Sequence, residues 1–461
     1  MRKTSLTSSR RNRKSIRDRR TRPARDTIAS NYQKTVLANG VRVVTEVIPH
    51  VRSVSLGVWL NVGSRDETAD RSGISHFIEH MVFKGTKRYR AHQIARSLES
   101  VGGYLNAFTS KEHTCFYAQV LDRHVGRAVD ILSDLVQFPL FNPGELEKEK
   151  QVVLEELKNI EDDPDDLIHD YFDRSLFGEH PLGFPVIGRA DSITAFRAAS
   201  LFEYLHRYYL PDRMVVAAAG NLKHDTLLHL VNKYFRGRGS YRRNGAAPRL
   251  RAPAKRFDAK TREYEKPISQ AHVCLGTLGC SVRSRSRYPI LVLNTLLGEG
   301  MSSRLFQNIR EKYGFAYNVY SFANTLSDTG TFGVYVGTGK DHIQNSIELI
   351  HRELDKLRSK GVSRAELQRT KEQLKGTMML SLESMSSRMM RLGTTELIFG
   401  DYVPLDTILR SIDSVTGEDV HELAGTLFDV KRFSTVIFNP TEKKPVTPQS
   451  SGSEERIETT A

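Results

Sequence analysis

Two pairs of segments in this chain follow the same plan. "RHVGRAVDILSDLV" (123–136) precedes "NPGELEKEKQVVLEEL" (142–157), and "DHIQNSIELIHREL" (341–354) precedes "VSRAELQRTKEQLKGT" (362–377). Each pair has the pattern of an amphipathic helix, a short turn and a long charged helix. Because the pattern recurs roughly 220 residues later, it indicates an internal duplication.

The segments before each pair also repeat. An Asn39–Gly40 turn between two strand-like runs predicts a hairpin, and further strands and helices follow it in both halves. The first half is predicted to have a strand over 53–63, helices over 72–84 and 91–101, and two strands within 104–121. The second is predicted to have a strand over 268–280, helices over 287–297 and 303–312, and paired strands within 315–338. The chain is therefore expected to hold two α/β halves of one design.

Composition divides the chain further. The halves are expected over 32–235 and 267–438, joined by a basic, Gly/Pro/Ala-rich, aperiodic linker at 236–266. The ends, 1–31 and 439–461, lack a core pattern and are expected to be disordered.

Charge is concentrated at the N-terminus. The net charge is +14, yet residues 1–26 hold eleven Lys/Arg and two Asp, which leaves +5 for the other 435 residues. Nucleic-acid binding is therefore not expected of the folded part. The basic tail itself has three readings: a solvated tail, a mitochondrial transit peptide, or a polyanion-binding arm.

The remaining composition is that of a soluble globular protein, with 39% hydrophobic and 26% charged residues. No apolar run approaches the roughly 18 residues that a membrane span requires. Three scattered cysteines, Cys115, Cys274 and Cys280, form neither a disulfide framework nor a CxxC site, which suits a reducing compartment.

One helix combines an apolar face with titratable residues. In "SGISHFIEHMVFKGT" (72–86), Ser72 as N-cap and Gly85 as stop predict a helix over 73–84. Ile74, Ile78 and Val82 share one face of it, as core residues should.

The same helix carries the pattern H-x-x-E-H. His76 and His80 are four residues apart and Glu79 lies beside them. Two imidazoles at this spacing can bind one metal ion, and the carboxylate can reach a water on that metal. The alternative is a pair of structural histidines, because the motif alone has modest specificity.

A third metal ligand must come from elsewhere, and the helix over 143–160 offers one. Asn142 can cap it and Pro143 fits its first position. Glu149 and Glu156 are seven residues apart, so they lie on one line along the helix. Such a glutamate could approach the first helix; the alternative is a solvated helix face.

In these segments the chain resembles the pitrilysin family of zinc metallopeptidases, which have an H-x-x-E-H motif (inverzincins). Within that family it resembles most the mitochondrial processing peptidase β-subunit and its bacterial single-chain relatives. The resemblance covers nearly all of 32–438. It rests on the following segments: "HFIEH" (76–80), "YLNAFTSKEHTCFYAQ" (104–119), "EKQVVLEE" (149–156), "FGEHPLGFPVIG" (177–188), "YYLPDRMVVAAAGN" (208–221) and "SSRLFQNIREKYGFAYNVYS" (302–321).

The resemblance implies roles for individual residues. His76, His80 and Glu156 are zinc ligands, with Glu155 the alternative to Glu156; Glu79 is the general base that activates a zinc-bound water. The other implied residues are a supporting glutamate (Glu149), an Arg/Tyr pair supplied by the second half (Arg310 and Tyr317) and a substrate-pairing edge strand (Asn106, Ala107, Phe108 and Thr109).

The resemblance also implies a fold and partners. It implies an α+β protein whose two homologous halves, each a mostly antiparallel sheet with helices packed on it, form a clam-like pair around a cavity. The expected activity is that of a zinc-dependent endopeptidase acting on extended peptides or precursor segments. The alternative is a non-catalytic scaffold subunit. A homodimer, or a heterodimer with an inactive paralogue, is expected in the bacterial cytoplasm or, alternatively, the mitochondrial matrix.

Overall fold

The computed structural model describes residues 31–235, 251–254 and 259–441. Nearly all of the two predicted tails and most of the predicted linker lie outside these residues. Two described segments differ from the predicted boundaries. Thr261–Lys266, placed in the linker, form strand β7, and Asn439 and Pro440, placed in the tail, complete β11. β7 alternates exposed and half-buried residues, which is an edge-strand pattern that its charged composition concealed.

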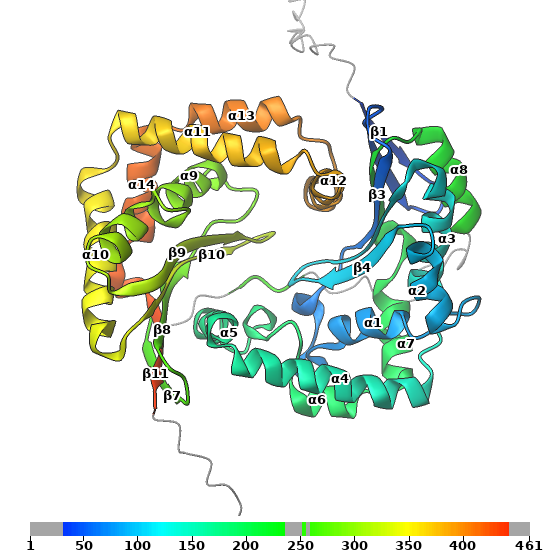
Figure 1. Ribbon diagram of the computed structural model, residues 1–461, viewed down its shortest axis with the longest axis horizontal. Helices are drawn as coiled ribbons and strands as arrows, with labels where there is room; N and C mark the ends of the chain where they lie inside the picture. The colour runs from blue at the N-terminus through cyan, green and yellow to red at the C-terminus, as the bar shows by residue number, and fades with distance from the viewer. Residues whose placement is uncertain (1–30, 236–250, 255–258, 442–461) are drawn as a thin grey trace, which may run out of the picture.

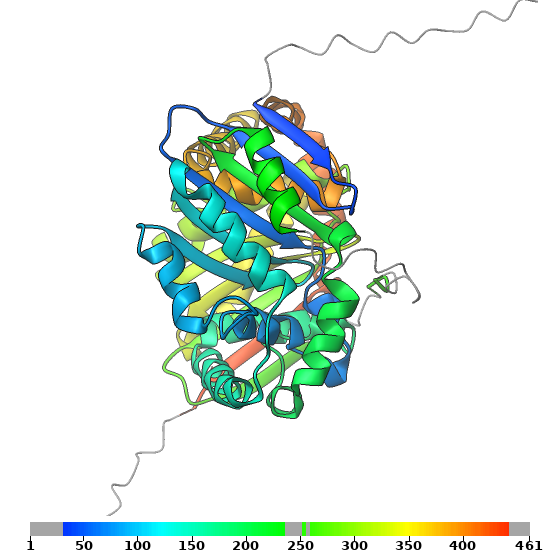
Figure 2. The same ribbon diagram turned by 90° about the vertical axis from the view of Figure 1, so that its right-hand side faces the viewer.

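The first half is built on a six-stranded sheet with the order β1-β2-β6-β3-β5-β4. β2 and β6 are parallel and all other neighbours are antiparallel. Helices α3 and α8 lie across its outer face (Figure 2). The strands are β1 (Tyr32–Val36), β2 (Arg42–Val47), β3 (Ser53–Leu60), β4 (Tyr104–Thr109), β5 (Thr114–Leu121) and β6 (Met214–Gly220). The helices are α1 (Ile74–Val82), α2 (Ala91–Glu99), α3 (Val125–Gln137), α4 (Pro143–Asp162), α5 (Pro164–Phe177), α6 (Ala190–Ala195), α7 (Ala198–Tyr208) and α8 (His224–Tyr234).

The second half repeats this design with a five-stranded sheet in the order β7-β11-β8-β10-β9. Again one pair, β7 and β11, is parallel and the others are antiparallel. The strands are β7 (Thr261–Lys266), β8 (Ala271–Leu278), β9 (Ala316–Thr325), β10 (Gly330–Thr338) and β11 (Ser434–Pro440). The helices are α9 (Arg287–Gly298), a π-helical segment (Phe306–Glu311), α10 (Ile343–Lys360), α11 (Arg364–Ser381), α12 (Met385–Phe399), α13 (Leu405–Ser414) and α14 (Gly417–Leu427). The prediction of two homologous α/β halves is confirmed.

Each half gives one helix to the other half's sheet (Figure 1). Met389 and Leu392 of α12 pack on Trp59 and its neighbours in the first sheet, on the face opposite α3 and α8. Conversely, α5 from the first half packs its buried Phe172 against the second sheet. α5 and α12 hold corresponding places in the two repeats, because each follows the helix pair that reveals the duplication. The two sheets are therefore joined by a reciprocal exchange of helices.

Ion pairs strengthen the attachment of α12. Glu396 is 1% exposed and lies 2.9 Å from Lys34 Nζ and 3.2 Å from Arg42 Nη1. Arg388 lies 2.7 Å from Glu46 on strand β2. Because these carboxylates are buried, each depends on a partner from the opposite half.

Candidate metal centre

Helix α1 carries both histidines of the motif. Ile74, Ile78 and Val82 are fully buried, as their spacing predicted. The rings of His76 and His80 lie on another face, with their centroids 4.6 Å apart. The helix thus presents two imidazoles side by side while its apolar face anchors it in the core.

The start of α1 differs from the prediction of Ser72 as the cap. Gly73 is the N-cap residue, with φ +91, and a Cβ there would lie 2.4 Å from the Ile187 carbonyl oxygen. The Glu67 carboxylate accepts the backbone N–H groups of Gly73 (2.7 Å) and Ser75 (2.8 Å). Burial raises the pKa of Glu67 to about 8, against the effect of these hydrogen bonds. The helix end is therefore fixed by a buried side chain from the preceding turn, not by the adjacent serine.

Helix α4 brings two glutamates to α1. Asn142 caps it by accepting from Gly144 N at 2.9 Å, and Pro143 is its first residue, as predicted. Glu156 Oε1 lies 3.7 Å from His76 Nε2, and Glu156 Oε2 lies 3.5 Å from His80 Nε2. Glu155 instead pairs with Lys158 at 2.6 Å on the exposed side of the helix. Of the two candidates for the third ligand, the structure brings Glu156 to the histidines.

These three residues fit a metal ion. One ligand atom from each of His76, His80 and Glu156 lies within 4.8 Å of the others. Both Nε2–carboxylate separations exceed hydrogen-bond length, so the atoms surround a common point rather than bonding each other. Burial, with His80 as the second cause, lowers the pKa of His76 to about 3, which favours the neutral imidazole that a metal requires. Two nitrogens and one carboxylate form a donor set typical of catalytic zinc.

Glu149, seven residues before Glu156 and so about two turns earlier in α4, supports this arrangement. It is 3% exposed, and its Oε1 lies 2.9 Å from His80 Nδ1. Its Oε2 lies 2.6 Å from Lys84 Nζ. Burial would raise the pKa of Glu149, but the hydrogen bonds from His80 and Lys84 lower it below its ordinary value. Lys84 was not singled out from the sequence, although it follows His80 by four residues.

Glu79 is poised beside the three candidate ligands. Its Oε2 accepts a hydrogen bond of 2.5 Å from Thr109 Oγ1, at the end of strand β4. Burial raises the pKa of Glu79. Sequence reasoning placed Thr109 only in the substrate strand, so its contact with the candidate base is an addition.

Strand β4 is the edge of the first sheet and pairs only with β5 among the described strands. Its predicted substrate residues have different surroundings. Asn106 is exposed, and its Oδ1 accepts the Ala107 N–H at 2.7 Å. Phe108 packs edge-on against Trp59, with ring centroids 5.7 Å apart. Thr109 faces Glu79, so only part of this strand presents side chains to solvent.

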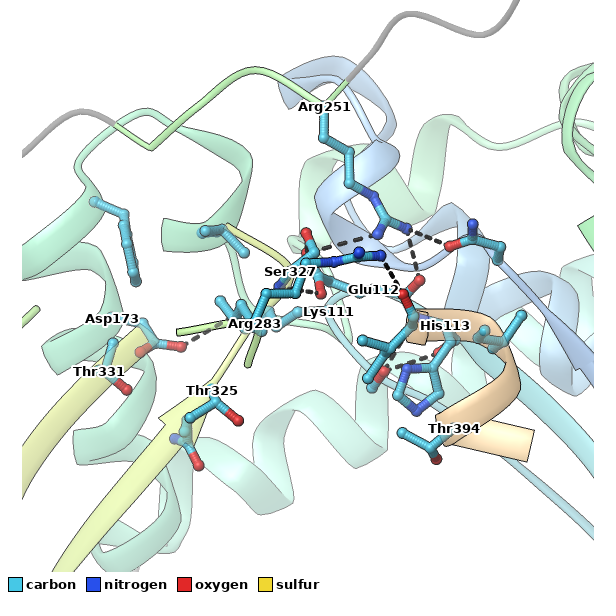
Figure 3. A pocket seen from close by; sticks show the side chains of 18 of the residues that line it. Lys111, Glu112, His113, Asp173, Arg251, Arg283, Thr325, Ser327, Thr331 and Thr394 are labelled. Atoms are coloured by element: carbon cyan, nitrogen blue, oxygen red, sulfur yellow. Dashed lines mark hydrogen bonds and ion pairs between the residues drawn. The ribbon is translucent and has the colours of Figure 1, made fainter. Parts of the chain in front are cut away.

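A cavity of about 490 Å³ begins at Ser110, immediately after β4 (Figure 3). Both halves line it. In Figure 3, Lys111 of the β4–β5 turn points toward Asp173 of α5, and the two lie 3.2 Å apart. Thr325 and Thr394, from β9 and α12, line the second-half side. Its size is in the range of ligand pockets.

An arginine joins the two halves beside this cavity. The side chain of Arg65 is 1% exposed. It donates to both carboxylate oxygens of Asp328 at 2.6 and 2.7 Å and to Glu112 at 2.7 Å. Glu112 also accepts the Ser327 N–H at 2.9 Å. The β4–β5 turn of the first half is therefore tied to the β9–β10 turn of the second.

Arg310 and Tyr317 lie apart from the first-half cluster in their contacts. Arg310 stacks over the rings of Phe306 and Tyr317, with the guanidinium carbon 4.8 and 5.4 Å from their centroids. Tyr317 is 77% exposed. Among the described residues, no hydrogen bond, ion pair or ring contact joins either side chain to the histidine–glutamate cluster. Their role at the site stays a prediction.

Fold and site together define a two-half α+β protein with an H-x-x-E-H metal motif in its first half. The chain belongs to peptidase family M16, the insulinase family, which confirms the resemblance to pitrilysin-type proteins. The family model described as Insulinase (Peptidase family M16) matches residues 42–190. The family model described as Peptidase M16 inactive domain matches residues 195–374. All three candidate ligands lie in the first range.

Individual relatives match almost end to end. "Uncharacterized zinc protease YmxG" of Bacillus subtilis is 44% identical over 88% of this chain and 98% of its own. An "uncharacterized zinc protease" of Rickettsia felis is 33% identical over 88% and 97%. A solved protease from Helicobacter pylori superposes with a TM-score of 0.82 at 23% identity, covering 89% of this chain and 99% of that one. That structural match supports the fold alone.

No described helix has the length and apolar character needed to cross a membrane.

Proposed function

We propose that this protein is a zinc-dependent endopeptidase that hydrolyses peptide bonds in extended peptides or precursor segments. The convergence of His76, His80 and Glu156 on one point, with Glu79 beside them, carries the proposal. Relatives named zinc proteases, matched over nearly their whole length, support zinc as the metal and a peptide bond as the target.

When held by these three residues, zinc supplies a Lewis acid that makes a water more acidic and polarises a carbonyl. Glu79 then accepts the proton of the attacking water at its carboxylate and delivers it to the leaving amine. Thr109 occupies Oε2 of Glu79 by donating to it, which leaves Oε1 for the transferred proton. Burial raises the pKa of Glu79 above its ordinary value, which makes its carboxylate a stronger base toward the water proton.

Strand β4 offers the substrate an open sheet edge, and an added strand would be held through its main chain regardless of its sequence. The Asn106 side chain accepts the Ala107 N–H at this edge, and a substrate carbonyl would take its place. A peptide along this edge would continue toward the cavity at Ser110.

Arg310 and Tyr317 would contribute from the second half if the halves close on a substrate. The expected homodimer or heterodimer is likewise a prediction, for sedimentation to test.

The decisive experiment measures zinc and peptide cleavage on one purified preparation. We expect about one zinc per chain, loss of cleavage of a fluorogenic peptide after chelation, and recovery when zinc is restored. His80→Ala should lose metal and activity together, whereas His92→Ala, on an exposed position of α2, should keep both. Cleavage that survives complete metal removal would exclude the metal mechanism. Stoichiometric zinc without any cleavage would favour the scaffold alternative.

A further inference from the structure

Glu149 is a buried carboxylate with two partners that have different chemistry. Each oxygen has one of them: Oε1 meets His80 Nδ1 at 2.9 Å and Oε2 meets Lys84 Nζ at 2.6 Å. The side chain of Glu149 is 4% exposed, whereas that of Lys84 is 32% exposed. A chain of contacts therefore runs from solvent through Lys84 and Glu149 to a candidate metal ligand.

The direction of the His80 hydrogen bond determines what its other nitrogen can do. An ionised carboxylate only accepts, so His80 must donate from Nδ1. In the neutral imidazole that a metal requires, the proton is then on Nδ1, and Nε2 keeps its lone pair toward Glu156 and the point that the ligands surround. Partners of this kind fix the tautomer and orientation of metal-binding histidines.

We propose that Lys84 is a positioning residue for the metal centre: by pairing with Oε2 of Glu149 it holds this carboxylate in the orientation that directs the Nε2 lone pair of His80 to the metal. A buried carboxylate without a counter-charge is costly, and Lys84 is the only cation in contact with Glu149 among the described residues. The spacing supports the assignment, because Lys84 follows His80 by four residues and so meets the same glutamate on α4. This inference rests on the proposed zinc site.

The test compares Lys84→Met, which keeps the length but removes the charge, with Lys84→Arg, which keeps the charge. Lys158→Met is the matched control, because Lys158 also pairs with a glutamate of α4 at 2.6 Å but lies on the exposed side. Zinc affinity is measured by competition with a chromophoric chelator. We expect Lys84→Met to bind zinc about 10- to 100-fold more weakly, Lys84→Arg to recover most of the loss, and Lys158→Met to match the parent.

A second readout separates positioning from simple stability. Burial opposes the effect, but the neighbouring glutamates raise the pKa of His80, so the tautomer is measured above that pKa, where the ring is neutral. In metal-free protein labelled with ¹⁵N-histidine, the parent should then show His80 protonated at Nδ1, and Lys84→Met should show a mixture of tautomers. Unchanged zinc affinity and an unchanged tautomer in Lys84→Met would overturn the inference while leaving the zinc site intact. A parent that binds no zinc would overturn the site and the inference together. If Lys84→Met fails to fold, Lys84→Gln serves for both measurements.

Discussion

At the scale of single residues, Glu79 bears the proton transfers of the proposed reaction without belonging to the ligand set. Glu79→Gln preserves size and can still accept the Thr109 hydrogen bond through its amide oxygen, but it cannot take a proton from water. We therefore expect it to retain one zinc per chain and to lose about 10²-fold or more in kcat. Zinc content and fluorogenic-peptide kinetics on the same preparation measure the two effects.

Glu155→Gln is the control for that experiment, because Glu155 is an exposed glutamate of α4 that pairs only with Lys158 in the described structure. It should keep both zinc and turnover. Loss of zinc from Glu79→Gln would mean that Glu79 is a ligand rather than a base.

Part of this site follows from sequence spacing alone. The positions of His76, His80 and Glu79 on one helix follow from helical periodicity, and Glu149 and Glu156 follow from a seven-residue interval. That Glu156 rather than Glu155 meets the histidines depends on how α4 is rotated against α1, which no local pattern encodes. The Glu67 cap and the Thr109 hydrogen bond were missed for the same reason, because each joins separate segments through side chains.

At the scale of elements, the contact between α12 and the first sheet depends on the absence of a side chain. A Cβ on Gly393 would lie 2.2 Å from atoms of the Trp59 indole. Gly393→Ala should therefore lower the free energy of unfolding by about 1–3 kcal/mol through overpacking. Urea unfolding followed by circular dichroism measures the change.

Gly376, within helix α11, has nothing within 4 Å of a built Cβ. Gly376→Ala should consequently stabilise the protein by about 0.5–1 kcal/mol, since alanine restricts the unfolded chain and favours helix. If Gly393→Ala and Gly376→Ala change the free energy of unfolding by the same amount, the close approach of α12 to Trp59 is not what excludes a side chain at position 393.

The duplicated helix pairs and most strands were predictable because each has its own periodicity. The exchange of α5 and α12 was not, because an amphipathic helix shows which face it buries but not against which sheet. β7 was missed because charged edge strands look like linker in composition.

At the scale of the whole molecule, Arg65 joins the two halves beside the cavity. Arg65→Met would remove the bidentate partner of Asp328 and leave Glu112, whose side chain is 11% exposed, with Arg251 at 3.5 Å as its remaining cation. We expect a loss of about 1.5–3 kcal/mol in the free energy of unfolding, the range for hydrogen bonds to charged groups. Arg52→Met is the control: its pair with Asp122 is exposed, so its loss should be below about 1 kcal/mol.

Separating the halves should damage the first one even though it holds every candidate ligand. A fragment of residues 1–235 would uncover the sheet face that α12 buries, including Trp59 and Val215, and would leave Glu46 without Arg388. We expect this fragment to self-associate in sedimentation experiments and to bind zinc poorly. Co-expression with residues 236–461 should restore both properties. A monomeric, zinc-binding fragment would contradict this account.

The exchange of helices also sets an order of events during synthesis. The first sheet gains its last strand when Gly220 is made, but its covering helix is not complete until Phe399, about 180 residues later. At a translation rate of about 5–20 residues per second, a nascent chain would carry an uncovered apolar sheet for roughly 10–40 s. We expect ribosome-bound chains that stop before residue 385 to recruit chaperones at this face. Chains long enough for residue 441 to have left the ribosomal exit tunnel should release them. Site-specific crosslinking from position 215 would measure the change.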